Sequence, residues 1–533
     1  MRKILILFML SLMVALSKAQ PLLTHPISTQ AEIGHAPCRD TLKIFSFVRG
    51  YDIGIILPSW PTIVSENYVA ELEGTVISDP KDGSNGPHVS GEELPFYHYS
   101  HDVNINVQPD ETPDHRYTNL TPYLVYDGEN GIKDTVLRKY MHVEWESGLA
   151  MSNYINPLRK LNNEGKSGGF FSAGHERGDV IWNWPSIGDW VHVEGTYVWD
   201  RGHPPAYAEI HPARFIATKR NLPTKIWFDD STSKFATRID IFASGDGGAL
   251  RNNRSDVKPF IRRVKMGSKD YDFVVKTNLP KPSASAHLKY RIGKNNADNF
   301  SANEKIEVND SGSIHIVIPW RSEYASDLDI YARSIYLYWD EGNGTAETYP
   351  IDEIKVNLSK LYFKKLSEAD GEAEVRLFVN VGSDWIFLND FYGKKGKVLS
   401  RGMGKTFKKD WTLNNEFTLY LPHDKNFRVY MAGWEVDGID DLMGDLLNPY
   451  SDCDRKTKFN FKKKLFDIKH MLLAGCMDDE YGEISRLHNS KGLSDTNFFT
   501  WSPKDGINDD PCPFSKYPLK DRYFLSYTIN KIK

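Results

Sequence analysis

The chain has 533 residues, a formal net charge of −5 and 40% hydrophobic side chains. A chain of this length forms about three domains. The weakly acidic balance, without blocks of like charge, argues against a protein that binds nucleic acid through a basic surface. An extracellular enzyme or binding protein fits this composition.

The chain opens with a segment typical of a secretory signal peptide. Arg2 and Lys3 precede an apolar run from Ile4 to Leu16, which is too short to cross a membrane as a helix. Small residues then offer a cleavage site after Ala19. We therefore expect residues 1–19 to be removed and the protein to be secreted or periplasmic, the alternative being an uncleaved N-terminal anchor. No other stretch is apolar for long enough to predict a transmembrane segment.

Short segments rich in β-branched and aromatic residues predict strands through the first part of the chain. Turns rich in glycine, asparagine, aspartate and proline separate them. After an N-terminal segment at 20–41, the pattern predicts a β-barrel or sandwich domain at 42–222 that carries the candidate site. The predicted strands are 41–48, 68–77, 102–108, 139–147 and 189–199.

The rest of the chain continues this pattern. Alternating segments predict a β-sandwich domain at 223–365 and a C-terminal β-sandwich domain at 366–533. Helical spacing occurs only in KKLFDIKHMLLAGC, where Leu465, Ile468 and Leu472 fall on one face. The predicted fold class is an all-β multidomain protein, built from barrel or sandwich domains, with a small C-terminal helical element.

The four cysteines are too few for a dense disulfide framework. Export permits disulfides, and three pairings are open. We favour Cys453–Cys476 because it closes a short local loop. No C-x-x-C spacing occurs, so metal binding by cysteine is not expected. The cysteines are Cys38, Cys453, Cys476 and Cys512.

Histidines and acids share strand faces in the first predicted domain. Half of the sixteen histidines lie between His98 and His211. Residues two apart on a strand share a face, so His142 projects with Glu144 in HVEWE, and Glu209 with His211 in EIH. An ordinary solvated sheet face explains the same pattern. The candidate cluster comprises His101, Asp102, His142, Glu144, Glu146, Asp200, His203, Glu209 and His211.

These side chains suit two kinds of site. Imidazole and carboxylate groups bind zinc, manganese or iron, and a metal with an open position generates a nucleophilic water near neutral pH. Without a metal, the same groups form an acid–base site. The predicted metal ligands are His142, His203, Glu209 and His211, and the predicted catalytic residues are Glu144, Asp200, His203 and Arg214.

The loop WDRGHPP between two of these segments has a stiff backbone. Two prolines follow His203 and fix the chain, while Gly202 allows conformations that other residues avoid. Rigid placement suits a preorganised site, and equally a tight β-corner. Arg201 and Arg214 are suited to bind an anionic substrate group, or to form salt bridges with the neighbouring acids.

The stretch 167–189 combines glycines with aromatic side chains. We expect a lid or a stacking platform in which His175, Trp182 and Trp184 contact a substrate. A loop folded onto its own small core is the alternative.

A second candidate site lies in GWEVDGIDDLMGD, residues 433–445. Its carboxylates are hard oxygen ligands suited to calcium, although their spacing differs from that of the EF-hand loop. Exposed acids that cap a helix explain them as well. The candidate calcium ligands are Glu435, Asp437, Asp440, Asp441 and Asp445.

The motifs SHDVN, HVEWE, GDWVHVEGTYVWDRGHPP and EIHPAR together resemble a pattern in an uncharacterised family of secreted bacterial β-rich proteins. AEVRLFVNV and GWEVDGIDDLMG extend the resemblance, which covers residues 90–220 and 370–445. It implies a shared site and names no reaction.

The sequence therefore predicts a secreted hydrolase, metal-assisted or acid–base, acting on an ester, phosphoester or glycan. Its expected partner is a small-molecule or glycan substrate and not nucleic acid, and the oligomeric state is left open. The rival is a non-catalytic extracellular module that binds glycan or protein, and a third alternative is a lipid-associated protein. Convergence of His142, His203 and His211 around a cleft favours the enzyme, whereas scattered histidines favour the binding module.

Overall fold

The structure is a computed structural model, and it describes a subset of the chain. In this subset the chain is almost entirely β-strand, with one 3-10 turn at Ser490–Gly492. No helix among these residues is long and apolar enough to cross a membrane. The signal peptide, the cysteines, the strand expected at 41–48 and the C-terminal helix lie outside it. The described residues are 61–63, 69–77, 88–92, 101–110, 125–126, 140–146, 184–200, 206–244, 270–294, 303–309, 311–319, 330–341, 349–363, 372–387, 398–400, 409–435, 480–503 and 523–532.

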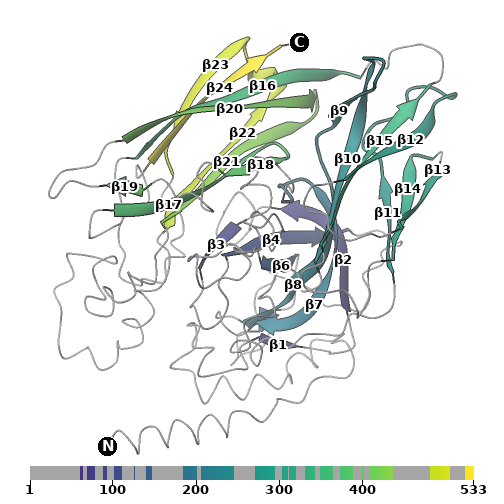
Figure 1. Cartoon of the computed structure of the whole chain (residues 1–533), viewed down its shortest axis with the longest axis horizontal. Coiled ribbons are helices and arrows are strands. Elements are labelled where there is room, and N and C mark those ends of the chain that lie inside the picture. Colours follow the sequence, from purple (N-terminus) through teal and green to yellow (C-terminus); the bar gives the residue numbers. More distant parts are fainter. Residues whose placement is uncertain are drawn as a thin grey trace, which may run out of the picture.

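Five strands of the N-terminal part pair in a closed ring, in the centre of Figure 1. The ring runs from β2 through β4, β6, β8 and β7 and returns to β2. Only the pair β6–β8 is parallel. If the five strands are numbered by their order in the chain, they follow one another around the ring as 1-2-3-5-4. This is the arrangement of the OB-fold, a five-stranded Greek-key barrel. The ring strands are β2 (Val69–Ile77), β4 (His101–Pro109), β6 (Met141–Glu146), β7 (Trp190–Asp200) and β8 (Ala206–Lys219).

Alternation along the ring strands creates the interior of the barrel. Leu72, Ile105 and Val143, one from each of three strands, are at most 1% exposed and point into the barrel. Their neighbours along each strand point outward. Gly74 lies where β2 crosses β4, and a Cβ there would come within 2.1 Å of the Gln108 carbonyl oxygen. Only glycine permits this close approach. The strands expected at 68–77, 102–108, 139–147 and 189–199 are therefore confirmed as β2, β4, β6 and β7.

Strand β8 belongs to the barrel and also to a larger sheet. Its second half pairs with β7 on one side and with β10 on the other. Beyond β10 the sheet continues through β15 to β12, so the boundary expected after residue 222 falls inside a continuous twelve-stranded sheet. The added strands are β1 (Pro61–Ile63), β3 (His88–Glu92), β5 (Val125–Tyr126), β9 (Thr224–Trp227), β10 (Ser233–Ser244), β12 (His287–Lys294) and β15 (Ile330–Asp340).

A three-stranded sheet, at the right in Figure 1, covers part of this large sheet and forms the middle sandwich. Its strands are β11 (Tyr271–Lys276), β14 (Ser313–Ile318) and β13 (Lys305–Asn309). Phe273 and Ile316 from this sheet pack with Phe215, Ile241 and Trp339 from the large one. The alternation of β11, with every second residue buried, follows directly from one face lying on this core.

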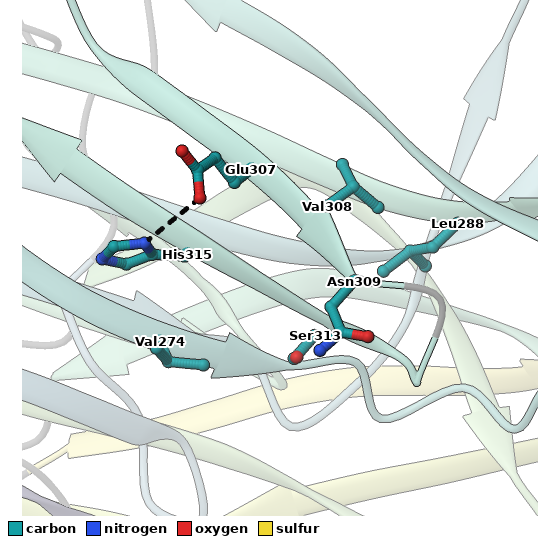
Figure 2. Close-up of a pocket in the computed structure, with 7 residues that line it drawn as sticks. All are labelled: Val274, Leu288, Glu307, Val308, Asn309, Ser313 and His315. Carbon is teal, nitrogen blue, oxygen red and sulfur yellow. Dashed lines mark ion pairs between the residues drawn. The ribbon is translucent and has the colours of Figure 1, made fainter.

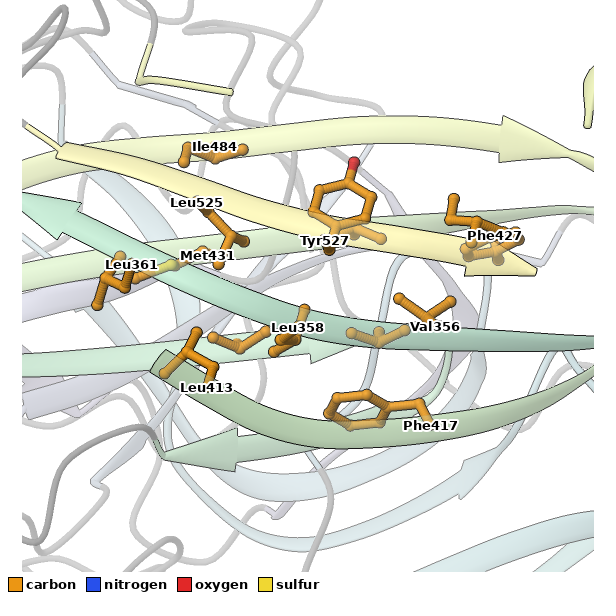
Figure 3. Packing of buried hydrophobic residues seen from close by; sticks show 14 of the residues in the cluster. Val356, Leu358, Leu361, Leu413, Phe417, Phe427, Met431, Ile484, Leu525 and Tyr527 are labelled. Atoms are coloured by element: carbon orange, nitrogen blue, oxygen red, sulfur yellow. The ribbon is translucent and has the colours of Figure 1, made fainter. Parts of the chain in front are cut away.

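The C-terminal sandwich, at the upper left in Figure 1, packs a four-stranded sheet on a five-stranded one. Figure 3 shows its apolar interior, where Leu358, Phe417, Met431 and Tyr527 interdigitate. Strand β16 alternates almost perfectly and pairs with β20 and β24, so it belongs to this sandwich although it precedes the boundary expected at residue 365. The strands are β16 (Ile351–Phe363), β17 (Glu372–Val381), β18 (Asp384–Phe387), β19 (Val398–Ser400), β20 (Lys409–Pro422), β21 (Asn426–Glu435), β22 (Glu480–Asn489), β23 (Thr496–Trp501) and β24 (Tyr523–Lys531).

A buried ionic chain ties the three parts together. Arg220 donates to Asp189, 2.9 Å away, and to Asp240, 2.6 Å away. Arg238 bonds the same Asp240 and reaches Asp384 of the C-terminal sandwich at 3.0 Å. Burial raises the pKa of Asp240, but the charges of Arg238 and Arg220 outweigh it and hold that pKa below its usual value. Paired charges can be buried, whereas removal of one partner leaves an uncompensated buried charge that strongly destabilises the protein.

Candidate functional site

The outer face of β4 and β6 carries the centre of the site expected from the sequence. Asn106 is the direct register partner of His142, and His142 Nδ1 lies 2.8 Å from Asn106 Oδ1. An amide oxygen can only accept, so Nδ1 carries the proton and the neutral ring has its lone pair on Nε2. His142 is thus oriented by a neighbouring strand, with Nε2 as its basic nitrogen.

The backbone register gathers further candidate residues beside His142. The parallel pair β6–β8 sets Glu209 directly across from His142, and β7 ends at Asp200, opposite Tyr207. The pair β4–β6 sets Glu144 opposite Asn104. Residues that the sequence separates by more than sixty positions therefore occupy adjacent strands. The positions in this patch whose side chains the structure does not describe are His101, Asp102, Glu144, Glu146, Asp200, Glu209 and His211.

Asn104 adds an unsatisfied polar atom to the same face. Its side-chain oxygen is buried and has no hydrogen-bond partner in the described part of the chain. Asn104 and Asn106 are two residues apart on β4 and so share a face. A buried acceptor without a donor is costly. The face therefore combines an oriented histidine with a buried amide oxygen that has no donor among the described residues.

Two of the expected site residues are buried. Trp184 is completely buried, and its carbonyl oxygen accepts a hydrogen bond from Arg220. Arg214 is only 4% exposed. Their roles toward a substrate stay predictions. Both positions follow from their place against β7 and β8, a tertiary context that a local pattern does not contain.

The remaining expected residues lie outside the description. Glu435 ends β21, but its side chain is not described. Among the residues whose side chains are described, no group of three or more histidine, cysteine, aspartate or glutamate residues is placed to hold a metal ion. The metal and calcium sites stay predictions. The expected residues that are not described at all are His175, Trp182, Arg201, His203, Asp437, Asp440, Asp441 and Asp445.

The sequence reasoning missed a buried polar triad centred on His192. His192 Nδ1 lies 3.0 Å from Glu73 Oε1, and Nε2 lies 3.1 Å from Glu194 Oε1. The ring stacks on Phe273 at 5.0 Å and is completely buried. The signal was present, because His192 and Glu194 repeat the H-V-E tripeptide of residues 142–144.

Both ring nitrogens of His192 face carboxylate oxygens, so the ring is held between Glu73 and Glu194. Because Phe273 of the three-stranded sheet seals the ring, this cluster holds the barrel against the middle sandwich and does not face a substrate.

A surface hollow of about 700 Å³ lies on the three-stranded sheet, and Figure 2 shows its lining. His315 Nε2 lies 2.7 Å from Asp272, and Nδ1 lies 3.8 Å from Glu307. Ser313 is nearby, but both ring nitrogens of His315 face carboxylates, so the ring does not activate that hydroxyl. Asp272 and Glu307 are substantially exposed. The hollow is a polar sheet face without a nucleophile.

Comparisons with known proteins leave the family open. No protein family and no curated protein matches the sequence. Among solved structures, the chain is similar to a C2 domain of plant extended synaptotagmin 1, with 10% identity over 34% of this chain and 96% of that one, at a TM-score of 0.17. It is also similar to human GIVD cytosolic phospholipase A2, with 6% identity over 64% of this chain and 29% of that one, at a TM-score of 0.17. Likenesses this low carry no argument about fold or function.

Proposed function

We propose that the protein is a secreted hydrolase that cleaves a glycan by acid–base or metal-assisted chemistry on the outer face of β4, β6 and β8. The observation that carries this proposal is the His142–Asn106 hydrogen bond, 2.8 Å long, which fixes the proton on Nδ1. Catalytic and metal-binding histidines are commonly held by a second contact of this kind, which sets the tautomer and the ring orientation.

The residues around His142 supply the partners that hydrolysis needs. A base accepts a proton from the attacking water, and an acid protonates the leaving oxygen. In the acid–base version, His142 is the base and Glu144 or Glu209 is the acid, with Asp200 as the alternative base. In the metal-assisted version, His142, Glu209 and His211 hold zinc, manganese or iron, and the ion supplies an activated water.

The barrel itself favours a glycan over the other substrates. In an OB-fold barrel, the face of the second and third strands binds oligosaccharides or oligonucleotides. Those strands are β4 and β6 here. A chain with a net charge of −5 and acids in this patch repels a polyanion such as a nucleic acid. Sugar hydroxyls instead donate to carboxylates.

The same observation supports a second candidate, a glycan-binding module without catalysis. An OB-fold face binds sugars whether or not an acid and a base are placed for cleavage, because fold alone does not determine chemistry. The two candidates share the ligand and the surface. They differ in whether His142 takes part in proton transfer or only in binding.

One set of measurements separates them. Purified full-length protein is analysed for bound metal and assayed for turnover on glycans, esters and phosphoesters, together with His142→Ala. His423→Ala, on the exposed end of the C-terminal sandwich beside Asp352, is the matched control. Glycan turnover that His142→Ala loses and His423→Ala keeps supports the hydrolase. Glycan binding without turnover supports the module. A protein that neither binds nor cleaves glycans contradicts both.

A further inference from the structure

A lysine on the hairpin of β9 and β10 lies among three aromatic rings. Lys225 Nζ is 5.1 Å from the centroid of Trp227, 5.9 Å from that of Phe235 and 5.7 Å from that of Tyr420. Each distance is within the range at which a cation is attracted to the face of a ring. We name Trp227, Phe235 and Tyr420 the aromatic cage.

Two separate parts of the molecule build the cage. Lys225 and Phe235 are direct partners across the β9–β10 hairpin, and Trp227 shares their face because it is two residues further along β9. Tyr420 comes from β20, the edge strand of the C-terminal sandwich, which contacts β9. Phe235 and Tyr420 meet edge to face, with centroids 5.5 Å apart. The cage forms only when the β9–β10 hairpin and β20 are both folded and in contact, and that contact sets the positions of the three rings.

The cation in the cage is held by ring faces and not by a carboxylate. Lys225 has no ion-pair partner among the described residues, whereas neighbouring Lys234 pairs with Asp340 at 2.9 Å. Trp227 is 59% exposed, so one wall of the cage borders solvent. Glu353 is the register partner of Tyr420. Burial and the charge of Glu353 raise the pKa of Tyr420. An acidic residue therefore lies on the strand beside the cage.

We propose that the aromatic cage is a binding site for a free quaternary ammonium cation, with Lys225 as its displaceable occupant. Rings whose faces converge on one cation are the standard means of recognising such groups. A quaternary ammonium offers no N–H donor, so it needs ring faces and a nearby negative charge, which Glu353 supplies. That charge disfavours zwitterions whose ammonium is tethered to a phosphate. Choline is therefore the expected kind of ligand, and phosphocholine binds less well.

The test uses isothermal titration calorimetry on the full chain with tetramethylammonium chloride as the probe and sodium chloride as the ionic control. If Lys225 fills the cage about nine-tenths of the time, its removal in Lys225→Ala strengthens binding about tenfold. Trp227→Ala removes the exposed wall and abolishes binding. Lys234→Ala, on the opposite face of the same hairpin, binds as the parent does.

Several outcomes overturn the proposal. A lack of saturable binding in both the parent and Lys225→Ala does so, provided that thermal unfolding shows both folded. Equal affinity of the parent and Lys225→Ala removes the lysine as occupant. Phosphocholine, or vesicles of phosphatidylcholine, bound more tightly than choline would identify a lipid headgroup and contradict the role of Glu353. Trp227→Phe, which keeps a smaller ring, retains weaker binding and guards against misfolding of Trp227→Ala.

Discussion

The barrel carries the tripeptide H-V-E twice, and the two copies have different surroundings. His142 on β6 bonds an asparagine of β4 on a face that the sheets of the middle sandwich do not cover in the described structure. His192 on β7 bonds two glutamates and is stacked on Phe273 of the opposing sheet. Identical local sequence thus gives a partly buried histidine bonded to an asparagine in one place and a sealed polar core in the other.

The comparison shows that the role of an H-V-E tripeptide depends on whether the three-stranded sheet packs on its face. A strand presents histidine and glutamate on one face in both cases. Where the three-stranded sheet packs on that face, the polar groups must satisfy one another, because a buried charge or donor without a partner is costly. Where that sheet does not pack, the histidine bonds an asparagine of the neighbouring strand instead.

Removal of His192 should have the largest effect. His192→Ala leaves Glu73 and Glu194 buried without their shared partner, and truncation of one member of a buried ionic cluster costs about 3–5 kcal/mol. Urea unfolding of the full chain measures the loss. His192→Gln, which keeps one hydrogen bond, should lose less. If His192→Ala lowers the free energy of unfolding by less than about 1 kcal/mol, the two H-V-E tripeptides do not differ in their contribution to stability.

Removal of His142 should give the opposite result. We expect His142→Ala to change the free energy of unfolding by less than about 1 kcal/mol, because its face is only partly buried. Glycan turnover should fall about 10²-fold or more, the usual contribution of a general base. Kinetics and unfolding on the same preparation measure both. Equal losses of stability in His142→Ala and His192→Ala would show that both histidines are structural.

A second buried histidine, His488, makes the stability of the chain sensitive to acid. Burial, with the neighbouring charge of Arg486, lowers the pKa of His488 to about 4, while its Nε2 lies 2.9 Å from Tyr527 Oη. The unfolded chain then binds more protons, so stability falls as the pH drops from about 6.5 to about 4, by about 2–3 kcal/mol. His488→Gln should flatten this part of the stability profile. An unchanged slope in the variant would assign the acid sensitivity to other groups.

The exposed histidine of the surface hollow should give the smallest effect. His315 is ion-paired with Asp272 at 2.7 Å, but both side chains reach solvent. Exposed pairs of this kind are worth about 0–1 kcal/mol. His315→Ala should therefore leave unfolding and glycan turnover close to those of the parent. A large loss of turnover in this variant would move the site from the barrel to the three-stranded sheet.

The sequence predicted the strands far better than their arrangement. Alternation in YVAELEGTVI and DVNINVQ is a local property, and it identified β2 and β4. The sheets continue across residues 222 and 365, because β8 pairs with β10 beyond the first position and β16 pairs with β24 far along the chain. No local pattern contains that choice.

The candidate site was predictable to the same extent. Strand alternation placed His142 on one face with Glu144, and the register shows that Asn106 and the already expected Glu209 lie directly across from it, a placement that only the pairing could reveal. The burial of Trp184 and Arg214 could not be read from the sequence, because burial depends on distant elements. His192 was overlooked although its tripeptide equals that of His142, since nothing local announces the sheet that covers it.

The double membership of β8 has a consequence for dissecting the molecule. A fragment that stops at residue 222 would keep the barrel strands but lose β10, and with it the partner of residues 215–219. That stretch would become a bare edge of apolar side chains, including Phe215 and Ala217, ready to pair with another copy. We therefore expect a fragment cut at residue 222 to aggregate, and a fragment that extends through β15 to keep the pairing of β8 and β10.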